Sequence, residues 1–124
     1  MADKKRATVE FLEFLADISH PATGAVQPKI LAQRLGLTEA ELIDRWTNRG
    51  AVSLPEFMCE ILSVLDGIQD QTLDLNKTMA SYRQLPLTPR FGARTADQVV
   101  SGGDGGCLAR AIKSGTLPVR LWRE

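Results

Sequence analysis

The chain has few of the side chains that carry most enzyme and metal chemistry. Its 124 residues include one histidine, His20, and two cysteines, Cys59 and Cys107, which do not form a C-x-x-C pair. A zinc site or a Cys/His nucleophilic pair needs more of these side chains at suitable spacing. The carboxylates are scattered over helix faces that we expect to be solvated. We therefore predict a protein that is not an enzyme and that has no cofactor or metal site.

Long apolar runs are missing as well. No segment approaches the ~20 apolar residues that a membrane span requires, and the basic residues 4–6 are not followed by the apolar stretch of a secretory signal. Both cysteines fall within apolar helical patterns, so we expect two buried, reduced thiols. The hydrophobic share of 44% is that of an ordinary globular protein. Together these features predict a cytoplasmic protein that does not bind a membrane.

The formal net charge of zero hides an asymmetry between the two halves of the chain. Residues 1–70 hold seven Lys and Arg against eleven Asp and Glu, a net charge of −4. Residues 71–124 hold eight against four, a net charge of +4. The basic C-terminal half would attract an acidic protein surface or nucleic acid. The alternative is that the two halves attract each other, within one chain or across a dimer.

Apolar spacing predicts an all-α fold of six or seven helices. Residues 8–18 place Phe11, Leu12, Leu15 and Ile18 on one helical face. No segment shows the alternation typical of a strand. We expect the remaining helices at residues 29–35, 38–48, 54–68, 74–84, 95–100 and 107–113.

The residues that begin several helices are clear in this sequence, whereas the end of the central helix is less clearly marked. Three helices should begin with a capping box, formed by Thr38 with Glu41, Ser53 with Glu56, and Thr95 with Gln98. Pro28 suits the first turn of another helix because its φ is fixed. Gly67 and the polar residues 69–71 predict that the central apolar helix frays or turns there.

The two helices between residues 28 and 46 have the spacing of a helix-turn-helix. Ala32 is small enough for a close crossing, Gly36 suits the turn, and Leu42 can bury the second helix. The second helix carries Glu39 and Glu41 in its first turn, where a DNA-binding helix would face base edges and phosphates. The pattern therefore favours helix-turn-helix geometry more strongly than DNA contact.

DNA binding nevertheless remains an alternative function. A dimer could still use the arginines of this region, and the weak DNA-binding candidates are Arg34, Thr38, Arg45 and Arg49. In that case the protein would be a stand-alone helix-turn-helix transcriptional regulator whose C-terminal part only dimerises.

The C-terminal tail, residues 115–124, has the composition of a binding segment. Apolar and basic side chains alternate in it, with Leu117, Val119, Leu121 and Trp122 beside Arg120 and Arg123. Tryptophan and arginine are the residues most enriched at interface hot spots. We predict that the tail binds another protein; the alternative is that it folds back over its own core.

Residues 79–117 resemble the toxin-binding domain of bacterial type II antitoxins of the Xre/MbcA/ParS kind. The matching elements are Tyr82-Arg83, the proline-containing link at 85–89, Phe91-Gly92-Ala93-Arg94-Thr95, the short helix after it, the helix at 107–113 and Gly115. The family often has tryptophan at the position of Tyr82, a second glycine at Ala93 and proline at Ala96. The helix-turn-helix-like N-terminal part also fits the family's layout.

The resemblance implies a function. Such antitoxins neutralise a RES-domain toxin, which consumes or uses NAD⁺, and their C-terminal region obstructs the route to its NAD⁺ site. Members commonly also repress their own operon, so operator DNA is a possible partner, and we expect a homodimer or a hetero-oligomer with the toxin. The division implied is a helix-turn-helix-like region at 1–72 and a toxin-binding region with its tail at 73–124. The toxin-binding residues implied are Tyr82, Arg83, Phe91, Gly92, Arg94, Thr95, Gly115, Leu117, Arg120 and Trp122.

Overall fold

The computed structural model describes residues 2–84, 87 and 94–113. Within these ranges the chain forms seven helices and no strand, which confirms the all-α prediction. The helices are α1 (Ala2–Ile18), α2 (Pro28–Arg34), α3 (Glu39–Arg49), α4 (Leu54–Thr72), α5 (Leu75–Gln84), α6 (Ala96–Ser101) and α7 (Gly105–Lys113). None of these helices is both long and apolar enough to cross a membrane.

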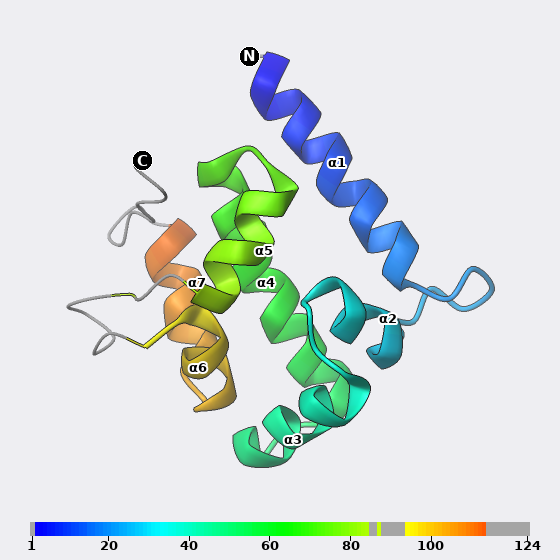
Figure 1. Ribbon diagram of the computed structural model, residues 1–124, viewed down its shortest axis with the longest axis vertical. Coiled ribbons are helices and arrows are strands. Elements are labelled where there is room, and N and C mark those ends of the chain that lie inside the picture. The colour runs from blue at the N-terminus through cyan, green and yellow to red at the C-terminus, as the bar shows by residue number, and fades with distance from the viewer. Residues whose placement is uncertain (1, 85–86, 88–93, 114–124) are drawn as a thin grey trace.

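Helix α4 is the centre around which the other helices pack. Helices α5 and α7 lie along it, and α1 packs against it as well. Helices α2 and α3 cover the lower part of the bundle in Figure 1, and α6 contacts α3, α5 and α7. Gly67 allows α7 to approach α4 closely, because a Cβ at this position would lie 3.0 Å from Cγ2 of Ile112.

The predicted capping boxes are all present. At α3, Thr38 Oγ1 accepts a hydrogen bond from the Glu41 N–H at 3.1 Å, and Glu41 Oε1 accepts one from the Thr38 N–H at 2.8 Å. The same reciprocal pair starts α4 and α6. Pro28 occupies the first turn of α2. Local side-chain chemistry therefore sets where these helices begin.

The prediction that the central helix ends near residues 69–71 is wrong, because α4 continues to Thr72. Gln69 is buried, and its side-chain amide donates to the carbonyl of Ala7 at 3.1 Å. Its Oε1 accepts a hydrogen bond from Thr78 Oγ1 at 2.6 Å. These bonds to α1 and α5 satisfy a polar side chain inside the bundle, so the helix continues through a polar segment.

Helix α1 turns a different face to the core from the one that was predicted. Phe11, Phe14 and Ile18 are buried, but Leu12 is 58% exposed. Successive residues of a helix point about 100° apart, so burying Phe11 and Phe14 turns Leu12 toward solvent. The placement of Leu12 on the inner face was wrong.

The prediction of two buried thiols is also wrong, because Cys59 and Cys107 are both exposed and unpaired. Each lies next to a buried residue in the sequence, Met58 in α4 and Leu108 in α7. The turn of the helix between adjacent positions takes the cysteine out of the core.

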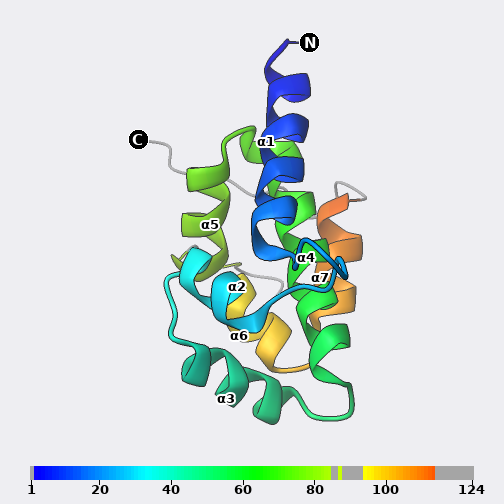
Figure 2. The same cartoon turned by 90° about the vertical axis from the view of Figure 1, so that its right-hand side faces the viewer.

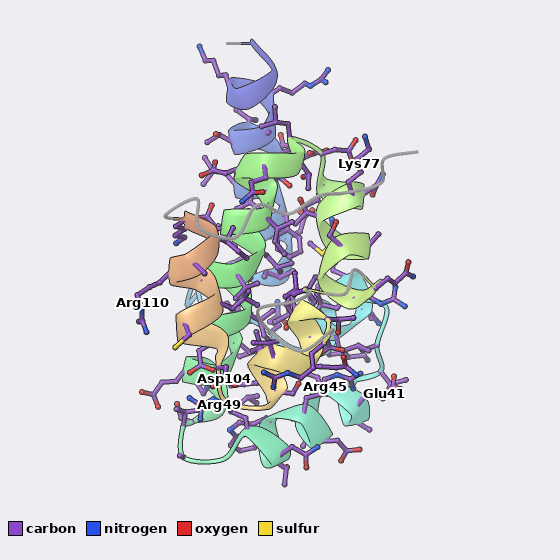
Figure 3. The ribbon with its side chains drawn as sticks, turned by 90° about the vertical axis from the view of Figure 1, so that its left-hand side faces the viewer. Glu41, Arg45, Arg49, Lys77, Asp104 and Arg110 are labelled. Carbon is purple, nitrogen blue, oxygen red and sulfur yellow. The ribbon has the colours of Figure 1, made fainter. Side chains whose placement is uncertain are left out.

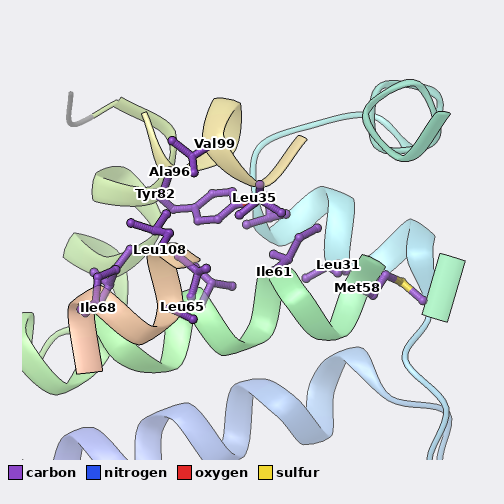
Figure 4. Close-up of a cluster of buried hydrophobic side chains, with 14 of the residues drawn as sticks. Leu31, Leu35, Met58, Ile61, Leu65, Ile68, Tyr82, Ala96, Val99 and Leu108 are labelled. Carbon is purple, nitrogen blue, oxygen red and sulfur yellow. The ribbon is translucent and has the colours of Figure 1, made fainter. Parts of the chain in front are cut away.

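One hydrophobic cluster runs through the described chain. It draws residues from all seven helices and crosses the boundary predicted between residues 72 and 73. In Figure 4, Tyr82 of α5 lies among Leu35 at the C-terminal end of α2, Val99 of α6 and Leu108 of α7. The predicted toxin-binding region is thus built on the same core as the helix-turn-helix.

Candidate protein-interaction site

Tyr82, the first residue of the predicted toxin-binding motif, belongs to the core. It is 1% exposed, and its ring points toward Leu35 (Figure 4). Burial raises the pKa of its hydroxyl well above the ordinary value, so this side chain is neutral at physiological pH. In this arrangement Tyr82 holds α5 against α2 and α6 and does not reach the surface.

The connection between α5 and α6 is held at both ends. Leu87 is buried, and its N–H donates to the carbonyl of Arg94 at 2.8 Å. This bond places Leu87 and Arg94 side by side on the body of the protein. Two predicted toxin-binding residues, Phe91 and Gly92, lie between them and outside the described residues.

At the start of α6, Thr95 caps the helix and Arg94 forms an ion pair at the surface. Thr95 Oγ1 accepts from the Gln98 N–H at 3.3 Å and caps the helix. The Arg94 guanidinium contacts Asp104 at 3.4 Å, with 41% and 50% of the two side chains exposed. A long ion pair between exposed groups contributes little stability. Arg94 therefore presents a cation at the surface, whereas Thr95 shapes the backbone.

Arg83 joins the toxin-binding motif to the helix-turn-helix. It lies at the C-terminal end of α5, and its guanidinium packs on Gly36 in the turn between α2 and α3. A Cβ at Gly36 would come within 2.7 Å of Arg83 Nη1. Gly36 also has φ of +79°, which favours glycine. The turn glycine thus has two reasons to lack a side chain.

Arg45 connects α3 to α6. Its Nε donates to both carboxylate oxygens of Asp97, at 2.9 and 3.0 Å, and its Nη1 donates to the carbonyl of Glu41 at 3.2 Å. Desolvation lowers the pKa of Arg45, but the hydrogen bond and charge of Asp97 outweigh it, and the pKa is raised overall. Arg45 is therefore a structural cation rather than one available to phosphate.

Arg49 makes a similar connection from α3 to α4. Its Nε and Nη2 donate to the two carboxylate oxygens of Glu60 at 3.0 and 2.8 Å, the bidentate geometry that arginine favours. The hydrogen bonds that Arg49 donates to Glu60 raise the pKa of Arg49. Figure 3 shows both arginines at the base of the bundle, with Arg49 near Asp104 and Arg45 near Glu41.

The other two DNA-binding candidates also have partners within the chain. Arg34 contacts Asp17 at 3.4 Å and lies over the ring of Phe14, 5.0 Å from its centroid. Thr38 is the N-cap of α3. The backbone N–H of Thr38 lowers the pKa of Glu41, which keeps that carboxylate charged beside the first turn of α3. The structure therefore does not assemble a cationic face on α3.

An apolar groove of about 400 Å³ lies between α1 and α4. Its lining includes Phe11, Leu12, Leu15, Cys59, Leu62 and Lys113. The sequence interpretation missed this groove, because it assigned Leu12 and Cys59 to the interior. A helical-wheel comparison of residues 7–18 could have found it, since the inner stripe is complete without Leu12.

The predicted residues of the tail cannot be placed. Gly115, Leu117, Arg120 and Trp122 lie outside the residues that the structure describes. The described chain stops at Lys113, whose ammonium contacts Asp66 of α4 at 3.7 Å.

No group of His, Cys, Asp and Glu in the described ranges could hold a metal ion. Comparison of the chain with protein-family models, with curated proteins and with solved structures finds no match.

Proposed function

We propose that this protein is an antitoxin that binds and neutralises a RES-domain toxin, an enzyme that consumes NAD⁺. The supporting observation is that the residues of the segment resembling a toxin-binding domain have two different roles. Tyr82 supports the motif from the core and Thr95 caps α6, whereas Arg83 is exposed beside Gly36 and the side chain of Arg94 is 41% exposed. A buried aromatic ring that supports arginines accessible to solvent is an arrangement suited to protein recognition.

The proposed mechanism is obstruction of the toxin's NAD⁺ route. Two segments would contact the toxin: residues 91–95, which end at the start of α6, and the tail after Lys113. The Arg94 guanidinium contacts Asp104, directly before α7, and Lys113 is the last residue of α7. The nine residues of α7 span on the order of 13 Å, so one partner face can meet both segments. In the tail, Leu117 and Trp122 would fill the cleft while Arg120 meets acidic groups of the toxin.

A truncation tests the role of the tail. The chain without residues 116–124 is co-expressed with a RES-domain toxin from the same operon, and growth and cellular NAD⁺ are measured. We expect the truncated chain to stay folded by circular dichroism but to leave the toxin active and NAD⁺ depleted. A matched control lacks only residues 123–124 and should still protect. Full protection by the longer truncation would refute the obstruction mechanism.

Operon repression is a second proposed role, supported by the helix-turn-helix geometry. Ala32 and Leu42 are fully buried, and Gly36 adopts the left-handed turn. A salt-dependent gel shift on the DNA upstream of the gene, with and without toxin, tests it. The stand-alone regulator hypothesis predicts specific binding without toxin that weakens on Arg34→Ala. Binding that requires the toxin would favour the antitoxin assembly instead.

A further inference from the structure

The outer face of α1 carries a second apolar stripe. Among the described residues, the exposed large hydrophobic side chains are Val9 and Leu12, at 48% and 58%. They lie one turn apart, and Leu12 also borders the α1–α4 groove. With Ala16, which is exposed, they continue along one side of the helix. Two large apolar side chains beside an apolar groove are expected to be covered by a partner.

The spacing of this stripe is that of a two-helix seam. Val9, Leu12 and Ala16 follow each other at intervals of three and four residues, as the inward positions of a coiled coil do, and Lys5 continues this spacing as a charged end of the stripe. The inner stripe of α1, which includes Phe11 and Phe14, is already used against the core. Figures 1 and 2 show the N-terminal half of α1 projecting beyond the other helices at one edge of the bundle. The outer stripe is therefore open to another helix.

The charges beside the stripe identify that other helix. Lys5 and Arg6 are exposed in the first half of α1, and Glu13 and Asp17 are exposed in the second half. Arg6 and Glu13 are seven residues apart and flank the seam on the same side. When two copies of α1 run antiparallel, each Arg6 faces Glu13 of the other copy, and a two-fold axis relates the two pairs. In a parallel arrangement, Arg6 and Glu13 of one copy would lie on the opposite flank of the seam from those of the other copy and could not pair.

We propose that two copies of this chain form a dimer through α1, with the helices antiparallel. Val9, Leu12 and Ala16 of each copy pack against the other copy's α1 and over its α1–α4 groove. Arg6 and Glu13 form two symmetric ion pairs that fix the orientation. This inference is independent of the proposed antitoxin function, because it uses no residue of the toxin-binding motif.

Sedimentation velocity of the full-length chain tests the dimer. We expect the wild type to be dimeric at micromolar concentration, and Leu12→Glu to raise the dissociation constant at least about 100-fold. Ala40→Glu, at an exposed position of α3, adds the same charge away from α1 and should remain dimeric. Because both positions are exposed, we expect both variants to be folded, and circular dichroism checks this. A monomeric wild type would overturn the proposal. So would a dimer that resists Leu12→Glu and is lost when residues 114–124 are removed.

A charge exchange tests the orientation. Arg6→Glu alone and Glu13→Arg alone should each weaken the dimer about tenfold, and the double variant should restore it. In a Cys59→Ser, Cys107→Ser background, Lys5→Cys with Ala16→Cys should cross-link the two copies, whereas Ala16→Cys alone should not. In the antiparallel dimer the two copies of residue 16 lie roughly 16 Å apart, beyond the reach of a disulfide. Efficient cross-linking through Ala16→Cys alone would contradict the antiparallel pairing.

Discussion

Arg45 of α3 and Arg94, which precedes α6, differ in how closely a carboxylate partner holds them and in how exposed they are. Arg45 is bonded through Nε to both oxygens of Asp97, and the two side chains are 29% and 14% exposed. Arg94 contacts Asp104 at 3.4 Å, and both side chains are at least 41% exposed. An arginine with a close, half-buried carboxylate stabilises the fold, whereas an exposed one with a loose partner can exchange that partner for another protein. The difference separates the structural Arg45 from Arg94, which we propose contacts a partner.

The largest expected effect comes from removing the support beneath the interaction site. Tyr82→Ala leaves a cavity among α2, α5 and α6 and should lower the free energy of unfolding by about 3–5 kcal/mol. Urea denaturation followed by circular dichroism measures it. Tyr82→Phe keeps the ring and is the matched control, with an expected loss below about 1.5 kcal/mol. A loss of toxin binding in a fully stable Tyr82→Phe variant would show that the hydroxyl contacts the partner.

The next effect tests whether Arg45 is structural. Asp97→Ala leaves a partly buried guanidinium without its carboxylate, and we expect a loss of about 2 kcal/mol of stability. Asp104→Ala removes the looser partner and should cost less than about 0.5 kcal/mol. A double-mutant cycle between Arg45→Ala and Asp97→Ala should give a coupling of about 1 kcal/mol or more. Equal losses for the two aspartates would remove the distinction between the two arginines.

A smaller effect should follow at the turn glycine. Gly36→Ala forces a side chain into a left-handed residue and displaces the guanidinium of Arg83, with an expected loss of about 1–2 kcal/mol. Gly24→Ala is the matched control, because Gly24 has φ of +74° and no atom within 4 Å of an added Cβ. The excess loss at Gly36 measures the contact with Arg83, and it should vanish in an Arg83→Ala background.

The smallest effect on stability should accompany a large effect on binding. Arg94→Ala should change the free energy of unfolding by less than about 0.5 kcal/mol, because its ion pair is exposed. If residues 91–95 contact the toxin, the same variant should weaken binding about tenfold or more. Isothermal titration calorimetry with the purified toxin measures that loss. Unchanged affinity would exclude Arg94 from the interface.

Features that depend on neighbouring residues were predictable from the sequence. Thr38 and Thr95 cap their helices through hydrogen bonds with residues three positions away, so the local sequence pattern is sufficient to predict these helix starts. The bond between Arg45 and Asp97 joins residues 52 positions apart, and no local pattern indicates it. Helix α4 likewise passes residues 69–71 because of the bonds of Gln69 to two other helices.

The other wrong predictions concerned which apolar residues of a helix face the core. Residues 8–18 contain more apolar positions than one face can bury, so periodicity alone did not decide between Phe11 and Leu12. The packing of α1 on α4 decides it by placing Phe11 and Phe14 inside. The same uncertainty placed Cys59 and Cys107 in the core, whereas both are exposed. Candidate interaction surfaces on α1 became visible only once the inner stripe was known.

The affinity of the purified toxin for the full chain and for the chain without residues 116–124 tests the central proposal most directly. The obstruction mechanism predicts that the truncated chain binds at least about 100-fold more weakly, because the tail carries the apolar and arginine anchors. It also predicts that excess truncated chain does not restore NAD⁺ in a hydrolysis assay. Equal affinity and equal inhibition by the two chains would contradict the proposal.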